Sequence, residues 1–199
     1  MALPHDDSSA RARYAAGRAA VPPEDLPQVW GEFELISLLG SGAFAMVYKC
    51  ERVGVGGFRK PMAIKIIRPT RRTSAHHLLT EARLSATLHH PNIVHTYDVG
   101  EHKGLVYIAM ELVQGCTALD LIEDHGRLPP AAAIDLVQQI ADALDYAHEV
   151  EVDGRPEGIV HRDVKSGNLL IDAAGGARLA DFGVAIRLDL DTDRTMAGT

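Results

Sequence analysis

The chain reads His161-Arg162-Asp163-Val164-Lys165-Ser166-Gly167-Asn168 and, thirteen positions after Asn168, Asp181-Phe182-Gly183. Two largely apolar runs lie between these motifs, Leu169–Ile171 and Arg178–Ala180, and a turn rich in Asp, Ala and Gly joins them. This pattern predicts a β-hairpin. With Ile171 opposite Arg178 and Leu169 opposite Ala180, Asn168 comes to lie beside Asp181. Amide and carboxylate oxygens at that spacing suit Mg²⁺, which binds few protein groups and completes its shell with water and phosphate.

The alternative without a functional role is a polar turn that carries two unrelated Asn and Asp residues. The neighbouring Asp163 and Lys165 argue against it, because they add a carboxylate and a cation to the same short loop. The stretch therefore predicts a site for a metal and a charged ligand.

A glycine-containing turn lies upstream, between two predicted strands. It reads Gly40-Ser41-Gly42-Ala43-Phe44-Ala45-Met46-Val47. Without a Cβ at Gly40 and Gly42, backbone N–H groups can close over phosphate oxygens. A Rossmann phosphate loop would lead from a strand into a helix, so a strand on both sides argues against that fold. Taken alone, two glycines in a hairpin more often make only a turn.

Lys65 lies in a predicted strand, Met62–Ile67, where it shares a face with Ala63 because side chains alternate with period two. A small residue beside a cation leaves room for a flat adenine next to a charge for phosphates. The alternative is a lysine at a sheet edge that reaches into water. Glu81, on a predicted helix from Ser74 to about Leu88, can supply the anion that keeps a lysine in a cleft charged and aimed.

Hydrophobic periodicity predicts an α+β fold with two lobes. Strands are expected near residues 33–39, 46–49, 62–67, 93–99 and 105–112, with the single helix among them, and a helical region follows Gly115. After Pro129-Pro130, apolar residues at three- and four-residue spacing predict one buried helix face, made of Ile134, Val137, Ile140, Ala141, Leu144 and Ala147. We expect a disordered leader at 1–31 and one domain at 32–199, with lobes at about 32–113 and 114–199.

Composition narrows the class of protein. The net charge of −7 argues against a nucleic-acid binder that relies on a broad basic surface. The sequence holds no apolar run of the roughly 20 residues that span a bilayer, and its start lacks the apolar core of a signal peptide. Cys50 and Cys116 lie far apart without metal-ligand spacing and are expected to be free thiols of a cytoplasmic protein.

Taken together and in this order, the motifs resemble the eukaryotic-like protein serine/threonine kinase family of bacterial type. The resemblance runs from about Phe33 to Thr199. It implies a two-lobed protein-kinase-like fold, with a five-stranded N-lobe, one main helix and an incomplete, mainly helical C-lobe. It also implies transfer of the γ-phosphoryl group of Mg-ATP to a hydroxyl of a protein substrate. Lys165, two positions after Asp163, resembles the serine/threonine rather than the tyrosine subgroup.

The resemblance implies roles for the residues of the catalytic loop. Asp163 would orient the substrate hydroxyl and accept its proton, with Lys165 as a further catalytic residue. Asn168 and Asp181 would hold Mg²⁺. A kinase of small molecules fits less well, because the glycine turn and Lys165 both match protein kinases better.

The resemblance also implies an ATP site. Lys65 would hold the α- and β-phosphates and pair with Glu81. Gly40 and Gly42 would shape the loop over the phosphates, although Ala45 stands where the family has a third glycine and would stiffen the end of that loop. The adenine would meet Val47, Ala63, Met110, the hinge from Glu111 to Val113, and Leu170.

The family continues beyond this sequence through an Ala-Pro-Glu-type motif and further helices, so we expect a chain truncated within the activation segment. Such a chain would expose part of the apolar face of the helix at residues 134–147. It leaves two alternatives to an active kinase open, a catalytically weak or inactive nucleotide-binding fragment and an unstable remnant.

Three further features concern possible ligands. Thr195 is a candidate phosphosite with Arg162 as its partner, which makes the chain itself a candidate substrate. Residues 189, 191 and 193 are aspartates that superficially match the start of an EF-hand, but Arg194 replaces the required glycine. The adjacent pairs His76-His77 and His89-His90 lack the spacing of ligands on one helical face.

Overall fold

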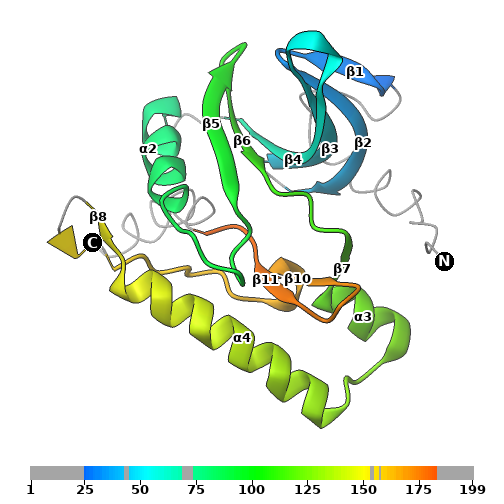
Figure 1. The fold of residues 1–199 in the computed structure, drawn as a ribbon, viewed down its shortest axis with the longest axis vertical. Coiled ribbons are helices and arrows are strands. Elements are labelled where there is room, and N and C mark those ends of the chain that lie inside the picture. The colour runs from blue at the N-terminus through cyan, green and yellow to red at the C-terminus, as the bar shows by residue number, and fades with distance from the viewer. Residues whose placement is uncertain (1–24, 43–44, 69–73, 153–154, 157, 183–199) are drawn as a thin grey trace, which may run out of the picture. The chain divides into compact units, whose positions relative to one another are not determined.

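The structure is a computed structural model, and it describes residues 25–42, 45–68, 74–152, 155–156 and 158–182. The chain divides into two compact units, Met1–Ala75 with Tyr97–Leu112, and His76–Thr96 with Val113–Thr199 (Figure 1). Thr195 and the aspartates at 189, 191 and 193 lie outside the described residues, as does the leader up to residue 24.

The first unit is built on a six-stranded sheet with the strand order β1-β2-β3-β4-β6-β5. The strands are β1 Gln28–Trp30, β2 Phe33–Ser41, β3 Ala45–Val53, β4 Arg59–Ile67, β5 Thr96–His102 and β6 Leu105–Met110. The five strands that the periodicity predicts are all present. A short 3-10 turn, η2 Val55–Gly57, forms the tip between β3 and β4.

The additional strand, β1, lies inside the segment that we expected to be an unstructured leader, and the sheet therefore begins earlier than predicted. One aromatic side chain explains the difference. Trp30 is 4% exposed and packs edge-on against the rings of His102 and Tyr107. Buried aromatic pairs of this kind contribute about 0.5–1.5 kcal/mol beyond the area they bury, which helps a three-residue strand hold its place.

Strand alternation separates the two faces of β4. Ile64 and Ile66 belong to the buried cluster of the first unit, together with Leu35, Tyr48 and Cys50. Ala63 and Lys65 lie on the other face, as the period-two pattern predicts.

The second unit contains three helices among the described residues, α2 Ala75–Ser85, α3 Ala118–His125 and α4 Pro130–Glu149. By its contacts α2 belongs to this unit, although it lies between strands of the first unit in the sequence. A small sheet with the order β11-β10-β7 comprises β7 Gly115–Thr117, β10 Leu169–Asp172 and β11 Ala177–Leu179. The short strands β8 Glu151–Val152 and β9 Arg155–Pro156 pair with each other, and a 3-10 turn, η3 Ser166–Asn168, precedes β10.

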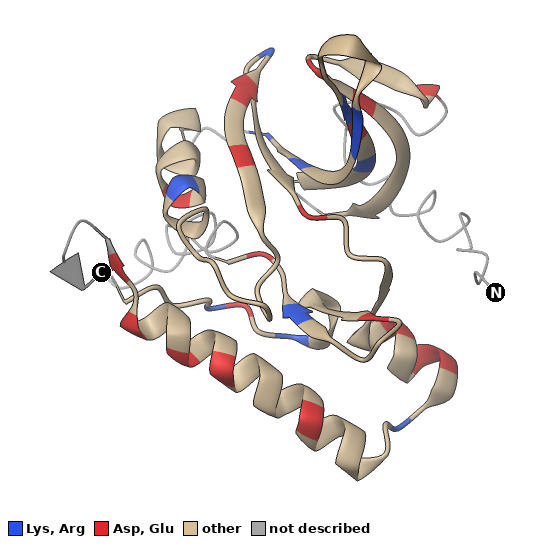
Figure 2. Cartoon of the chain, viewed as in Figure 1, with Lys and Arg blue, Asp and Glu red and all other residues tan. Residues whose placement is uncertain are grey.

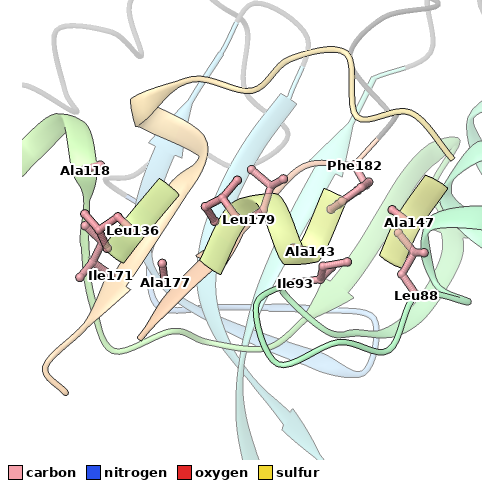
Figure 3. Packing of buried hydrophobic residues seen from close by; sticks show 11 residues of the cluster. Leu88, Ile93, Ala118, Leu136, Ala143, Ala147, Ile171, Ala177, Leu179 and Phe182 are labelled. Atoms are coloured by element: carbon pink, nitrogen blue, oxygen red, sulfur yellow. The ribbon is translucent and has the colours of Figure 1, made fainter. Parts of the chain in front are cut away.

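Helix α4 packs along the hairpin of β10 and β11 (Figure 3). Its buried residues are Leu136, Ile140, Ala143 and Ala147. The predicted face is only partly buried: Ile134 and Val137 are 60% and 64% exposed, which confirms the expectation that part of this apolar face is exposed. The buried stripe is rotated toward Leu136 and Ala143, since these side chains meet the hairpin residues Ala177 and Leu179 in one cluster.

The solvent side of α4 carries Ile134, Val137 and several alanines, and beside them a series of acidic residues. Figure 2 shows acidic residues along α4, and its sequence gives them as Asp135, Asp142, Asp145 and Glu149. Acidic residues also mark α3, whose start is stabilised by a capping box between Thr117 and Asp120. Among the described residues, neither α4 nor any other helix has the length and apolar character needed to cross a membrane.

Candidate active site

The carboxylate of Asp163 is held by two neighbours on its own loop. Lys165 donates from Nζ to Oδ2 across 2.6 Å, and Asn168 donates from Nδ2 to the same oxygen across 3.1 Å. The hydrogen bond from Lys165, ahead of that from Asn168, lowers the pKa of Asp163 below its ordinary value against the opposing effect of burial. Asp163 is therefore an ionised and oriented carboxylate at neutral pH.

The side-chain amide of Asn168 has a defined orientation. Its Nδ2 also donates to the backbone carbonyl oxygen of Asp163 across 2.9 Å. Both partners are acceptors, so the amide nitrogen must face Asp163 and the amide oxygen points the other way. Asn168 thus presents a hard oxygen on the side away from the carboxylate of Asp163, the type of ligand that Mg²⁺ prefers.

The hairpin after Asn168 has a register one residue different from the prediction. The expected partner of Leu169 was Ala180, and the observed partner is Leu179. The pairs are Leu169–Leu179, Leu170–Arg178 and Ile171–Ala177.

The side chain of Asp172 explains the shift. Its Oδ1 accepts from the backbone N–H groups of Ala174 and Gly176, and its Oδ2 accepts from Arg178. Gly175 has φ +86°, a conformation that favours glycine. These bonds close the turn one residue earlier than a count of apolar residues suggests.

The observed register still places Asn168 and Asp181 at the same end of the hairpin. The backbone N–H of Ala180 donates to the carbonyl oxygen of Asn168 across 2.9 Å, and Asp181 follows directly. Asp181 itself has φ +68°, so the chain turns sharply at this residue. A non-glycine residue in this conformation is uncommon, and such residues cluster at functional sites.

His161 connects the catalytic loop to this end of the hairpin. Its Nδ1 accepts from the backbone N–H of Asp163 across 3.2 Å, and its Nε2 lies 2.8 Å from the carbonyl oxygen of Ala180. The side chain is 1% exposed and packs edge-on against Phe182. Burial lowers the pKa of His161, so the neutral imidazole with its proton on Nε2 is the form that satisfies both bonds. The sequence alone does not predict this role of His161, because the pattern around a single histidine does not indicate its contacts.

In the first unit, five predicted site residues share one face of the sheet. Val47 pairs with both Gly40 and Lys65, so these three lie side by side across β2, β3 and β4. Ala63 lies two residues before Lys65 and pairs with Met110 of β6. Lys65 is 7% exposed, and the sheet therefore carries a buried cation beside a small residue, as predicted.

The two glycines of the turn have open surroundings. A Cβ at Gly40 would meet no atom within 4 Å, and one at Gly42 would meet only the carbonyl oxygen of Ala45, at 3.7 Å. Neither glycine has the positive φ that would require it. The packing of the described chain therefore does not explain them, which fits a role toward a bound ligand.

The remaining predicted residues are placed as follows. Glu81 is half-buried on α2, one turn before Ser85, whose Oγ donates to the carbonyl oxygen of Phe182 across 2.8 Å. Glu111 and Val113 directly follow β6 and are half-buried. Leu170 is half-buried on β10, opposite Thr117 of β7. The catalytic-loop residues thus gather in the second unit, and the residues around Lys65 gather in the first.

The comparisons with known proteins agree with this arrangement. The protein kinase domain family matches residues 33–199. Serine/threonine-protein kinase PrkC of Bacillus subtilis is 34% identical over 83% of this chain, and serine/threonine-protein kinase PknD of Mycobacterium tuberculosis is 36% identical over 87%. The chain spans about a quarter of the length of these two relatives, 24% and 26%.

Solved structures agree as well. The PknI kinase domain of Mycobacterium tuberculosis superimposes with a TM-score of 0.68 at 29% identity, covering 84% of this chain and 64% of that one. The apo form of PpkA-294 has a TM-score of 0.69 and covers 88% of this chain and 66% of that one; at 22% identity it shows the fold alone. The chain belongs to the protein kinase family. Within that family it groups with bacterial serine/threonine kinases.

Proposed function

We propose that the chain transfers the γ-phosphoryl group of Mg-ATP to serine or threonine hydroxyls of a protein substrate. The geometry of Asp163 carries this proposal. Its carboxylate is ionised, is held by Lys165 and Asn168, and is 30% exposed at the side chain, so a hydroxyl from outside can reach it. Phosphoryl transfer demands positioning and charge neutralisation more than covalent work from the protein, and this loop is built for both.

Asp163 orients the substrate hydroxyl and accepts its proton as the new P–O bond forms. A low pKa does not prevent this role, because a carboxylate that mainly aims the hydroxyl need not be a strong base. In the free protein, the hydrogen bond from Lys165 orients the carboxylate of Asp163 and lowers its pKa further below the ordinary value. The ammonium of Lys165, with a side chain 58% exposed, is also able to contact the transferred phosphoryl group.

ATP binding involves the predicted residues of the first unit together with Glu81 and Leu170. Lys65 binds the α- and β-phosphates, with Glu81 as its ionic partner, and the backbone around Gly40 and Gly42 closes over the phosphates. The adenine contacts Val47, Ala63, Met110 and Leu170, and it bonds the backbone of the hinge from Glu111 to Val113. The shared sheet face and the open space at both glycines support this assignment.

The residues at the end of the hairpin fit a magnesium ion. Asn168 directs its amide oxygen away from Asp163, and the carboxylate of Asp181 follows a sharp turn at the same end. Mg²⁺ usually takes one or two carboxylate or amide ligands and completes its shell with water and substrate phosphates. When bound, the ion would neutralise the charge of the phosphates. Asn168 and Asp181 would hold it.

The proposed cellular location of the chain rests on its two free cysteine thiols and on its use of ATP. Cys50 and Cys116 are both free. Free thiols are typical of a reducing compartment, and ATP is abundant there. We therefore include a cytoplasmic location in the proposal. The chain itself, at Thr195, is a further candidate substrate.

The proposal is tested by the identity of the phosphorylated residue. The full chain is incubated with MgCl₂, ATP labelled in the γ-phosphate and a mixture of unstructured proteins, and the labelled amino acids are then separated after acid hydrolysis. Label on serine and threonine is expected. Label only on tyrosine, or release of phosphate to water without protein labelling, would contradict it. A Thr195→Ala variant shows which part of the label lies on the chain itself.

A further inference from the structure

Gln139 on α4 uses both ends of its side-chain amide on neighbouring segments. Its Oε1 accepts from the backbone N–H of Ala177 across 2.8 Å and from Nδ2 of Asn92 across 3.0 Å. Its Nε2 donates to Oδ2 of Asp135 across 3.1 Å and to the carbonyl oxygen of Gly175 across 3.3 Å. One half-buried side chain therefore satisfies four polar groups around the start of β11.

Asn92 completes the contact at the same residue. Its Nδ2 donates to the carbonyl oxygen of Ala177 across 2.7 Å, so the backbone N–H and C=O of Ala177 are both bonded by side chains. Two residues further on, Leu179 bonds the backbone of the same loop: its N–H donates to the carbonyl of Asn92, and its C=O accepts from Val94.

These bonds lie on the edge of β11 that does not pair with β10. An exposed edge of a three-residue strand would be free to slip or fray. Here the edge is covered by two side chains at Ala177 and by backbone at Leu179. The last residues of this strand lead directly to Ala180 and Asp181.

We propose that Gln139 is a positioning residue for the magnesium site: by holding β11 in register at Ala177, it sets the place of Asp181 relative to Asn168. This inference rests on the proposed function. A shift of one residue in β11 would exchange the faces of its side chains and remove the backbone bond between Ala180 and Asn168. Such a shift would weaken Mg²⁺ binding, because ligands that are misplaced by about 0.5–1 Å no longer fit an ion with strict octahedral geometry.

Replacing Gln139 by methionine tests this step, because Gln139→Met keeps the length of the side chain and removes all four hydrogen bonds. The matched control is Gln138→Met at the preceding position of α4, where the side chain is exposed. For each full-length variant, calorimetry measures the binding of an ATP analogue with an imido β–γ bridge over a series of Mg²⁺ concentrations. Thermal unfolding is recorded in parallel.

We expect Gln139→Met to raise the Mg²⁺ concentration for half-maximal binding about tenfold, at the low end of the loss that follows removal of an outer contact of a metal site. Gln138→Met should match the wild type. A purely structural role for Gln139 would lower the melting temperature and leave this concentration unchanged in the folded fraction.

A second experiment, which exchanges the hydrogen-bond donor of Gln139 with the acceptor of Asp135, is used if Gln139→Met folds poorly. Gln139→Glu keeps the acceptor for Ala177 and Asn92, but its second oxygen faces two acceptors, Oδ2 of Asp135 and the carbonyl oxygen of Gly175. In the pair Gln139→Glu with Asp135→Asn, the new asparagine donates to the new glutamate. The single variant should weaken Mg²⁺ binding, and the pair should recover part of the loss, because the contact with the carbonyl oxygen of Gly175 is not restored.

Three results would overturn the inference, and they are distinguishable. If Gln139→Met matches Gln138→Met in Mg²⁺ dependence, Gln139 does not position the site. If Gln139→Met folds poorly and Gln139→Glu binds Mg²⁺ as Gln138→Met does, Gln139 does not position the site. If the wild type binds no magnesium nucleotide at all, the proposed function fails and the inference fails with it.

Discussion

His161 donates from Nε2 to the carbonyl oxygen of Ala180 across 2.8 Å, and this bond links the loop that carries Asp163 to the end of the strand that precedes Asp181. The same ring accepts the N–H of Asp163 at Nδ1. Protonation of the ring would remove that acceptor. The two halves of the candidate site in the second unit therefore depend on a neutral histidine.

The stability of the chain should fall as the pH falls below about 6.5. Burial lowers the pKa of His161 from its ordinary value of 6.5, so the unfolded chain takes up a proton at a pH where the native chain does not. The contribution is complete above the unfolded pKa and is lost as the pH falls toward the lowered native pKa. Urea unfolding between about pH 7.5 and pH 5.5 measures it. His161→Gln should flatten this dependence, whereas His148→Gln, at an exposed position, should not; equal profiles for the two variants would contradict the prediction.

Removing the ammonium of Lys165 should raise the pKa of Asp163, because the hydrogen bond from Lys165 is the largest cause of its lowered value. Asn168 contributes less, so Lys165→Met should raise the pKa more than Asn168→Ala does. Titration of the Asp163 carboxyl carbon by NMR checks the order. A larger effect of Asn168→Ala would show that the amide, rather than the ammonium, controls the charge of this carboxylate.

Lys65→Met should abolish the thermal stabilisation that Mg-ATP gives to the wild type. A ligand at about 100 times its Kd stabilises a protein by about 2.7 kcal/mol, and loss of the phosphate-binding cation should remove most of it. Lys60→Met is the control, since Lys60 lies on the same strand with the opposite parity and covers the ring of Tyr97. Retained stabilisation in Lys65→Met would remove Lys65 from the nucleotide site.

Gly115→Ala should destabilise the second unit by about 2 kcal/mol or more, since overpacking against a rigid neighbour costs about 1–3 kcal/mol and sometimes more. A Cβ at Gly115 would lie 1.9 Å from the carbonyl oxygen of Ile171, so β7 and β10 would have to separate. Gly40→Ala is the matched substitution in open space and should change the unfolding free energy by less than about 0.5 kcal/mol. Equal losses in the two variants, measured by urea unfolding, would contradict the close approach of these strands.

The sequence predicts much of this architecture because its strongest signals are local. Period-two alternation around Lys65 predicts the face that it shares with Ala63, and the neighbouring strands confirm it. The motifs around Asp163 and Asp181 predict the ends of one hairpin. These features depend on residues only a few positions apart.

The errors arise where specific side-chain hydrogen bonds, or packing between two elements, decide the outcome. The hairpin register depends on the bonds that Asp172 makes within its turn, and a count of apolar residues does not contain them. The rotation of α4 follows from its contact with β11, which leaves Ile134 exposed and buries Leu136. The contacts of Gln139 cannot be predicted from the sequence, because a glutamine on a helix has no pattern that indicates its partners.

The most direct test of the central claim compares phosphoryl transfer by the full chain with transfer by its Asp163→Asn variant, using Mg-ATP and a protein substrate. The substitution keeps the shape of the side chain and removes the charge that orients and deprotonates the hydroxyl. We expect that the wild type labels serine and threonine and that Asp163→Asn is slower by at least about 10²-fold, with nucleotide binding retained. Transfer by the wild type that is no faster than by Asp163→Asn would contradict the claim.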